Sequence, residues 1–197
     1  MSELRERLTT ALSRPTGPSS DFDLNRSAVP PSQRSLRGAG VLVPVRHDGR
    51  MILTKRASHL SQHPGQIAFP GGKIDPTDAD ATAAALREAW EETALPTDAV
   101  EVLGHLPTHE TVTGFTITPV LALVSGDPPL RPEIGEVSEI FEVPLSFVAD
   151  PGNFTVQSRV WRGQRRHYYA VPFGPYYIWG ATARILRGLA ERMTWQD

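Results

Sequence analysis

The segment REAWEET, at residues 87–93, concentrates carboxylates in a short stretch that follows a run rich in alanine. Glu88, Glu91 and Glu92 are spaced i, i+3 and i+4, so in a helix all three side chains project from one face. Alanine, leucine, arginine and glutamate all favour a helix. The segment therefore predicts a helix over about residues 78–93 that carries one acidic face.

The rest of this predicted helix is largely apolar, as expected for an amphipathic helix that covers a sheet. The residues expected to pack against that sheet are Leu86, Ala89, Trp90 and Thr93. Pro96 lacks the backbone N–H that a continuing helix would need, so the helix should end before it.

The acidic face has two interpretations. Like charges at this spacing cost a helix about 0.2–0.5 kcal/mol per pair, and Arg87, four residues before Glu91, balances only part of the charge. A simple solvated face is one interpretation. The other is a site for Mg²⁺ or Mn²⁺, because these cations prefer oxygen ligands and remove the repulsion between carboxylates.

The loop before the helix favours the second interpretation. Residues 69–76 read FPGGKIDP, with two adjacent glycines. Glycine permits close approach of the backbone, so the Gly72 carbonyl is a candidate metal ligand. Lys73 adds a cation that suits a phosphate oxygen. A glycine pair, an acidic spacer and REAWEET at fixed spacing together indicate a site for metal and phosphate.

Residues 71–95 resemble the Nudix box, in which a glycine-led first half precedes Arg-Glu-apolar-any-Glu-Glu. The second half matches fully. The first half departs from the pattern, because Gly72 lies fifteen residues before Arg87, one more than the pattern has. Asp78 falls where the pattern has a glutamate, and Ala94 replaces its final glycine.

These departures carry expectations of their own. The final glycine normally ends the helix in a left-handed conformation, where alanine costs about 1 kcal/mol. Ala94 should therefore be a strained helix end. Asp78 and Asp80 are both expected to serve as helix caps rather than as functional residues.

A second motif, ILTKRASHLSQHPGQIAFPGG at residues 52–72, resembles the segment that precedes the Nudix box in coenzyme A pyrophosphatases. The branch often carries a basic residue near Ser61, which this sequence lacks. Further similarity extends over about residues 36–190. The matching positions are Ile52, Leu53, Thr54, Arg56, Gly65 and Phe69–Gly72.

The resemblance implies an enzyme that hydrolyses the diphosphate of coenzyme A to 3′,5′-ADP and 4′-phosphopantetheine with Mg²⁺ or Mn²⁺. It implies that Arg87 orients a glutamate and that Glu136 is the first candidate for the general base, ahead of Glu139 and Glu110. The implied metal ligands are Glu88, Glu91, Glu92 and the Gly72 carbonyl. The implied substrate contacts are Arg56, Lys73, Thr54, Gly65 and Phe69, with Arg56 also the candidate for the 3′-phosphate.

Two alternatives stay open. One is a Nudix hydrolase of ADP-ribose or dinucleotides. The other is a non-catalytic module that senses a nucleotide, although such modules usually lose glutamates that this helix keeps.

Composition excludes several classes of protein. The chain has 197 residues, a net charge of −2, a pI near 6.3 and a mean hydropathy of −0.26. These values are typical of a globular protein and give no sign of binding to nucleic acid or to an acidic membrane. The absence of cysteine excludes disulfides and thiolate chemistry. Without a secretory signal or a membrane span, a cytoplasmic protein is expected.

The chain is expected to divide into an N-terminal helix and extended arm at 1–35 and a Nudix hydrolase domain at 36–197. The arm, rich in proline and serine, is expected to wrap the core or to reach a partner subunit in a homodimer. The expected fold is α+β, a Nudix-like α/β/α sandwich with a mixed sheet. Its strands are expected at 39–45, 51–56, 66–69, 99–106, 115–124, 138–145, 154–161 and 165–172, and its helices at 2–13, 78–93 and 176–193.

Overall fold

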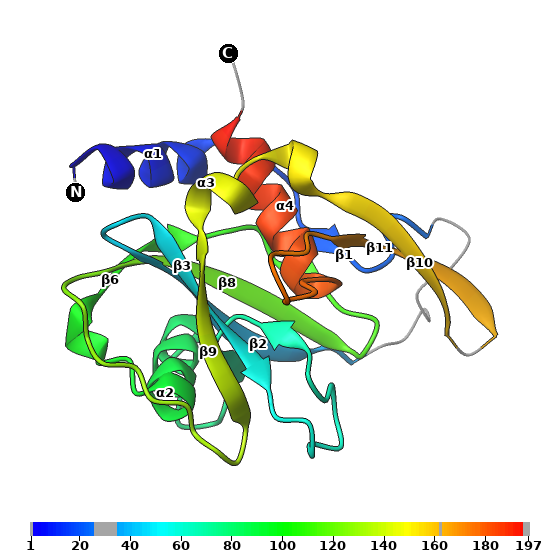
Figure 1. The fold of residues 1–197 in the computed structure, drawn as a ribbon, viewed down its shortest axis with the longest axis horizontal. Coiled ribbons are helices and arrows are strands. Elements are labelled where there is room, and N and C mark those ends of the chain that lie inside the picture. Colours follow the sequence, from blue (N-terminus) through cyan, green and yellow to red (C-terminus); the bar gives the residue numbers. More distant parts are fainter. Residues whose placement is uncertain (1, 26–34, 162, 195–197) are drawn as a thin grey trace.

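A computed structural model describes residues 2–25, 35–161 and 163–194 of the chain. Runs of strands are separated by helices along the chain (Figure 1). The helices are α1 (Ser2–Ser13), α2 (Ala81–Thr93), α3 (Leu145–Val148) and α4 (Ala181–Met193), with 3₁₀ turns at Thr97–Ala99 and Pro151–Asn153. The strands are β1 (Ser19–Ser20), β2 (Arg37–Arg46), β3 (Arg50–Arg56), β4 (Ile67–Ala68), β5 (Gly71–Lys73), β6 (Val100–His105), β7 (His109–Glu110), β8 (Phe115–Val124), β9 (Val137–Pro144), β10 (Thr155–Trp161) and β11 (Gln164–Ala170).

The central sheet is mixed. Strand β2 pairs in parallel with β8, with Val43 opposite Leu121, and antiparallel with β3 and β5. Strand β9 extends the sheet beyond β3, and β6 and β7 pair with β8. Strands β10 and β11 form a separate two-stranded hairpin.

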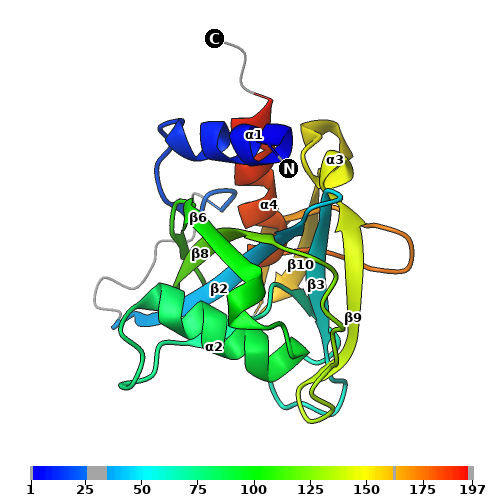
Figure 2. The ribbon, with the colours of Figure 1, turned by 90° about the vertical axis from the view of Figure 1, so that its left-hand side faces the viewer.

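Helices cover both faces of this sheet, because successive strand residues point to opposite faces. Leu42 and Ile52 pack with Ala85 and Ala89 of α2 on one face. Val43, Met51 and their neighbours pack with α1 and α4 on the other. Figure 2 shows α2 below the sheet and α1 and α4 above it. The expected α/β/α sandwich with a mixed sheet is confirmed.

Helix α2 begins at Ala81, not at Asp78. Asp80 is the N-cap, and its side chain accepts a hydrogen bond of 2.8 Å from the Ala83 N–H. The helix ends at Ala94 in the left-handed conformation, with φ of 55°. The strained alanine expected at the helix end is therefore present, and Asp80 confirms its expected capping role.

The face of α2 that meets the sheet consists of alanine rather than of large side chains. A Cβ atom at Gly40 of β2 would lie 2.0 Å from the Ala81 carbonyl oxygen, so only glycine permits this close approach. Ala85 and Ala89 fill the contact, while Trp90 is 52% exposed. The expectation that Trp90 packs on the sheet was wrong, because the contact follows the row of Ala81, Ala85 and Ala89, and the residue after Ala89 is rotated about 100° away from that row.

The N-terminal segment shares the core of the domain. Leu8 and Ala11 of α1 are buried in the same cluster as Leu186 and Leu189 of α4. Strand β1 then pairs in parallel with β7. The segments on either side of the boundary expected at residue 35 therefore share one hydrophobic core. Part of the expected arm, at 26–34, lies outside the described residues.

The last helix starts later than expected. Residues 176–179 form bridges instead, with Phe173 opposite Tyr176 and Ala170 opposite Trp179, and α4 follows from Ala181. The β10–β11 hairpin, expected from the sequence, extends away from the sheet (Figure 1). No helix in the described part of the chain is long and apolar enough to span a membrane.

Candidate active site

The glutamate face of α2 lies against β5, which the glycine pair forms. A Cβ atom at Gly72 would lie 2.3 Å from the Glu88 Oε1 atom. Glycine at this position therefore leaves the space that the Glu88 carboxylate occupies, beside the backbone expected to supply a carbonyl ligand.

Glu92 is the most buried of the three glutamates, with only 4% of the residue exposed. Its Oε2 accepts a hydrogen bond of 3.1 Å from the Gly71 N–H, and its Oε1 lies 3.8 Å from Arg56 Nη1. Burial raises the pKa of Glu92 to about 7, and the charges of Glu88 and Glu136 act in the same direction. Without a cation, this carboxylate is costly to ionise.

Arg87 organises the carboxylates around it. Its Nη1 donates to Glu88 at 3.1 Å and to Glu91 at 2.9 Å. Its Nε and Nη2 donate to Asp78 at 3.0 and 2.9 Å, and this pairing holds the pKa of Asp78 below its ordinary value. Asp78 therefore anchors Arg87 and does not cap the helix as expected. The planar guanidinium of Arg87 donates in several directions at once, which suits a residue that orients glutamates.

The donor chemistry of this region fits a hard divalent cation. Burial is the main cause that raises the pKa of Glu88; the charge and hydrogen bond of Arg87 oppose it, and nearby Glu91 and Glu136 raise it further. Carboxylate and carbonyl oxygens are the ligands that Mg²⁺ and Mn²⁺ prefer. In this structure Glu88 and Glu91 form ion pairs with Arg87. Among the described residues, no three His, Asp or Glu side chains lie close enough together to hold a metal ion.

Glu136 is an exposed residue directly before β9. Its carbonyl accepts a hydrogen bond of 2.8 Å from the Ala57 N–H, which fixes it at the end of β3. Its charge raises the pKa of both Glu88 and Glu92, so its carboxylate lies near the glutamate helix. By contrast, Glu139 accepts a hydrogen bond from the Tyr176 hydroxyl, and Glu110 lies in β7 beside the N-terminal arm.

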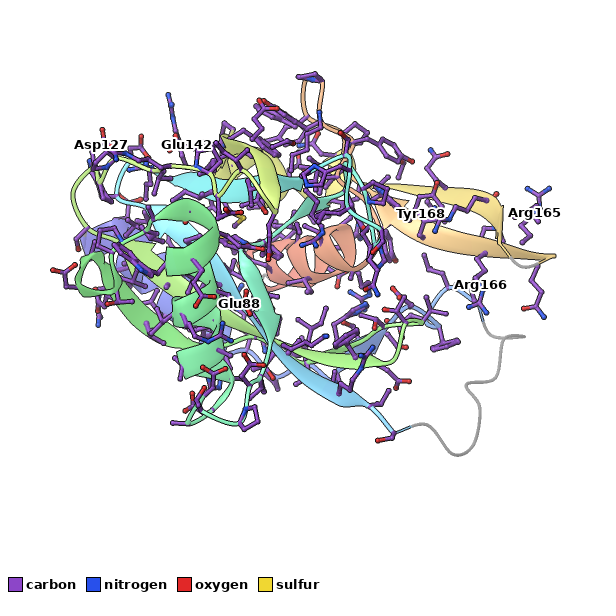
Figure 3. All side chains as sticks on the ribbon, turned by 90° about the horizontal axis from the view of Figure 1, so that it is seen from below. Glu88, Asp127, Glu142, Arg165, Arg166 and Tyr168 are labelled. Atoms are coloured by element: carbon purple, nitrogen blue, oxygen red, sulfur yellow. The ribbon has the colours of Figure 1, made fainter. Side chains whose placement is uncertain are left out.

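A cavity of about 410 Å³ adjoins the glutamates through Gly71 and Gly72. From there it extends past the 111–115 loop to the β10–β11 hairpin and the start of α4. Figure 3 shows Glu88 on α2 and, farther along the molecule, Arg166 and Tyr168 on the hairpin. The cavity therefore connects the acidic site to a second region built by the C-terminal half of the chain.

The residues expected to contact substrate fall into two groups. Arg56, Phe69 and Lys73 line the cavity. Thr54 is buried, and its hydroxyl donates to the Ala68 carbonyl at 3.3 Å, while Gly65 forms a turn with φ of 67°. In the structure Thr54 and Gly65 thus shape the loop that carries the cavity wall, and neither lines the described cavity.

Sequence reasoning did not select the far wall of the cavity as a site. That wall includes Arg159, Arg166, Tyr168 and Trp179. The arm adds Asp21, whose carboxylate accepts from the Val112 N–H at 2.8 Å. The strands predicted at 154–161 and 165–172 contained one signal, because the hairpin that they form places the two arginines opposite each other.

Comparisons with known proteins identify the family. A NUDIX domain model matches residues 34–159. The proteins described as uncharacterized Nudix hydrolase NudL from Salmonella heidelberg (strain SL476) and Salmonella agona (strain SL483) are each 44% identical over 173 residues, covering 87% of this chain and 90% of the relative. A C. elegans Ap4A hydrolase structure is 20% identical with a TM-score of 0.47, covering 55% of this chain and 80% of that one. The domain match and the similarity to NudL show that the chain belongs to the Nudix hydrolase family.

Proposed function

We propose that the protein hydrolyses the diphosphate of coenzyme A and its derivatives, using Mg²⁺ or Mn²⁺. The observation that carries this proposal is the position of the segment at residues 52–72. Its members Arg56, Gln66 and Phe69 line the cavity that adjoins the glutamate helix. A segment that precedes the Nudix box thus borders the cavity that, in this proposal, would receive the substrate, as expected of a segment that selects substrates.

In this proposal Glu88, Glu91, Glu92 and the Gly72 carbonyl would hold the cation. A bound divalent cation neutralises phosphate charge and lowers the pKa of water. Arg87 keeps Glu88 and Glu91 oriented through its two hydrogen bonds, as a residue that positions ligands does.

Arg56 and Lys73 supply positive charge at the same end of the cavity. They would contact diphosphate oxygens and offset the repulsion that an approaching nucleophile meets. A carboxylate oxygen of Glu136 would accept the proton of the attacking water. The water oxygen bonds to one phosphorus as the bridging P–O bond breaks. The products are 3′,5′-ADP and 4′-phosphopantetheine, and two protons are released once both new phosphate monoesters are fully ionised.

A product assay tests the proposal. The purified protein is incubated with coenzyme A, ADP-ribose, NADH or diadenosine polyphosphates in Mg²⁺ or Mn²⁺, and products are separated by chromatography. The expected result is the highest kcat/KM for coenzyme A. A higher kcat/KM for ADP-ribose or for a dinucleotide would reject the coenzyme A assignment.

The Glu91→Gln variant tests the role of the acidic face. Loss of one metal-holding carboxylate should lower turnover on the order of 10³-fold, which corresponds to about 4 kcal/mol of barrier. Glu91 is largely exposed, so the fold should be unaffected. Turnover equal to that of the wild type, or activity that survives a chelator, would exclude this role.

A further inference from the structure

Two arginines face each other on the hairpin at the far end of the cavity. Arg159 of β10 and Arg166 of β11 are register partners, and residues directly opposite in an antiparallel pair project from the same face. Both line the cavity, together with Tyr168 two residues farther along that face. Like charges placed directly opposite each other destabilise a hairpin. An anion bound between the two guanidinium groups would offset this repulsion.

Arg159 differs from the arginines that pair with carboxylates. In the described part of the chain it forms no ion pair, and its guanidinium stacks 4.3 Å from the ring centroid of Trp179. The stacking holds the guanidinium plane while leaving its N–H groups available. Carboxylate partners serve Arg5, Arg46, Arg50, Arg56, Arg87, Arg184 and Arg187 instead.

The charge balance of the cavity also favours an anion. Among the described residues that line it, the cationic side chains are Arg56, Lys73, Arg159 and Arg166, whereas Asp21 alone is a carboxylate. Asp21 already accepts hydrogen bonds from the Val112 N–H and pairs with His109. Arg56 lies beside Glu92, whereas Arg159, at the hairpin end, forms no ion pair with any described residue.

We propose that Arg159 and Arg166 form a subsite for a phosphate monoester that the substrate carries apart from its scissile diphosphate. Guanidinium groups bind phosphate oxygens through two parallel hydrogen bonds, and a pair of them suits a doubly charged monoester. The ring of Trp179 beneath Arg159 and the ring of Tyr168 border the subsite.

This inference rests on the proposed function and specifies it. Coenzyme A carries such a monoester on the 3′-oxygen of its ribose, and dephospho-coenzyme A lacks it. NADPH carries one on a 2′-oxygen, and NADH lacks it. The hairpin would therefore distinguish the substrate that carries the monoester from the one that lacks it in each pair. Arg56 would instead serve the diphosphate end of the cavity, where it lies beside Glu92.

The test compares Arg159→Ala and Arg166→Ala with the wild type. The matched control is Arg165→Ala, because Arg165 donates to Ser158 Oγ at 3.1 Å and does not line the described cavity. For each protein, kcat/KM is measured for coenzyme A against dephospho-coenzyme A and for NADPH against NADH. Loss of a charge-assisted contact should lower the preference for the phosphorylated substrate roughly 10- to 150-fold. The kcat/KM for the substrates without the monoester should change little, and Arg165→Ala should match the wild type.

A binding measurement keeps the subsite testable even if coenzyme A is not hydrolysed. Calorimetry with 3′,5′-ADP, 2′,5′-ADP and 5′-AMP reports the monoester contact without turnover and separates the two ribose positions. Tighter binding of either bisphosphate than of 5′-AMP, lost in Arg159→Ala and partly kept in Arg159→Lys, supports the subsite. Equal affinities in the wild type, or a preference that survives both alanine substitutions, would overturn it. Failure to cleave coenzyme A together with the expected binding would reject only the proposed function.

Discussion

Replacing Glu92 with glutamine should stabilise the metal-free protein at alkaline pH. The pKa of Glu92 is raised from 4.5 to about 7, chiefly because the carboxylate is buried. Between these values the unfolded chain releases the proton that the folded protein keeps, so the free energy of unfolding falls as pH rises. At about 1.4 kcal/mol per pKa unit, the difference amounts to about 3 kcal/mol by pH 8.

Glutamine retains the oxygen that accepts from the Gly71 N–H and carries no charge at any pH. The stability of Glu92→Gln relative to the wild type should therefore increase by about 3 kcal/mol from pH 4.5 to pH 8. For a chain of this size that corresponds to about 6–12 °C in melting temperature.

Urea unfolding in the presence of a chelator, at pH 4.5 and at pH 8, measures this effect. The control is Glu91→Gln, which removes an exposed ion pair worth at most about 1 kcal/mol. Adding Mg²⁺ at pH 8 should stabilise the wild type more than Glu92→Gln, because a ligand of the folded state stabilises it by mass action. A difference between Glu92→Gln and the wild type that does not vary with pH would refute the reasoning.

The other predictions concern the helix end and the N-terminal helix. Ala94→Gly should raise the free energy of unfolding by up to about 1 kcal/mol, because φ at this position is 55° and glycine adopts it without strain; an unchanged urea midpoint would contradict this. Leu8→Ala should lower it by about 2–5 kcal/mol, because Leu8 is fully buried against the core of the domain. The melting temperature measures the second effect, and a loss no larger than that of an exposed leucine would show that α1 packs only loosely.

The parts of the fold that follow from local periodicity could be predicted from the sequence. The glutamate spacing marks one face of a helix, and the alternating strands mark the two faces of a sheet. Trp90 was misplaced because its apolar character suggested burial, while the approach of α2 to Gly40 depends on a residue in a distant strand. Helix α4 begins late because Tyr176 and Trp179 form bridges with residues across a turn, which periodicity does not reveal.

The acidic half of the site was predicted, and the far half of the cavity was not. Glu88, Glu91, Glu92, Arg87 and the glycine pair lie within one continuous segment, so spacing alone brings them together. The cavity instead joins segments far apart in the chain, from Asp21 in the arm to α4. Such a surface depends on tertiary packing, for which a single sequence carries little direct signal.

The family match ends at residue 159, while the cavity continues into β11 and α4 and back to the arm. The glutamate helix thus lies inside the shared domain, and much of the surface that would contact the remainder of a substrate lies outside it. If the proposed function holds, substitutions in the hairpin or arm would alter which molecule is accepted and would leave the bond-breaking groups on the glutamate helix untouched. Within such an architecture, new substrate preferences can arise without rebuilding the chemistry, and a domain match alone is a poor guide to the molecule consumed.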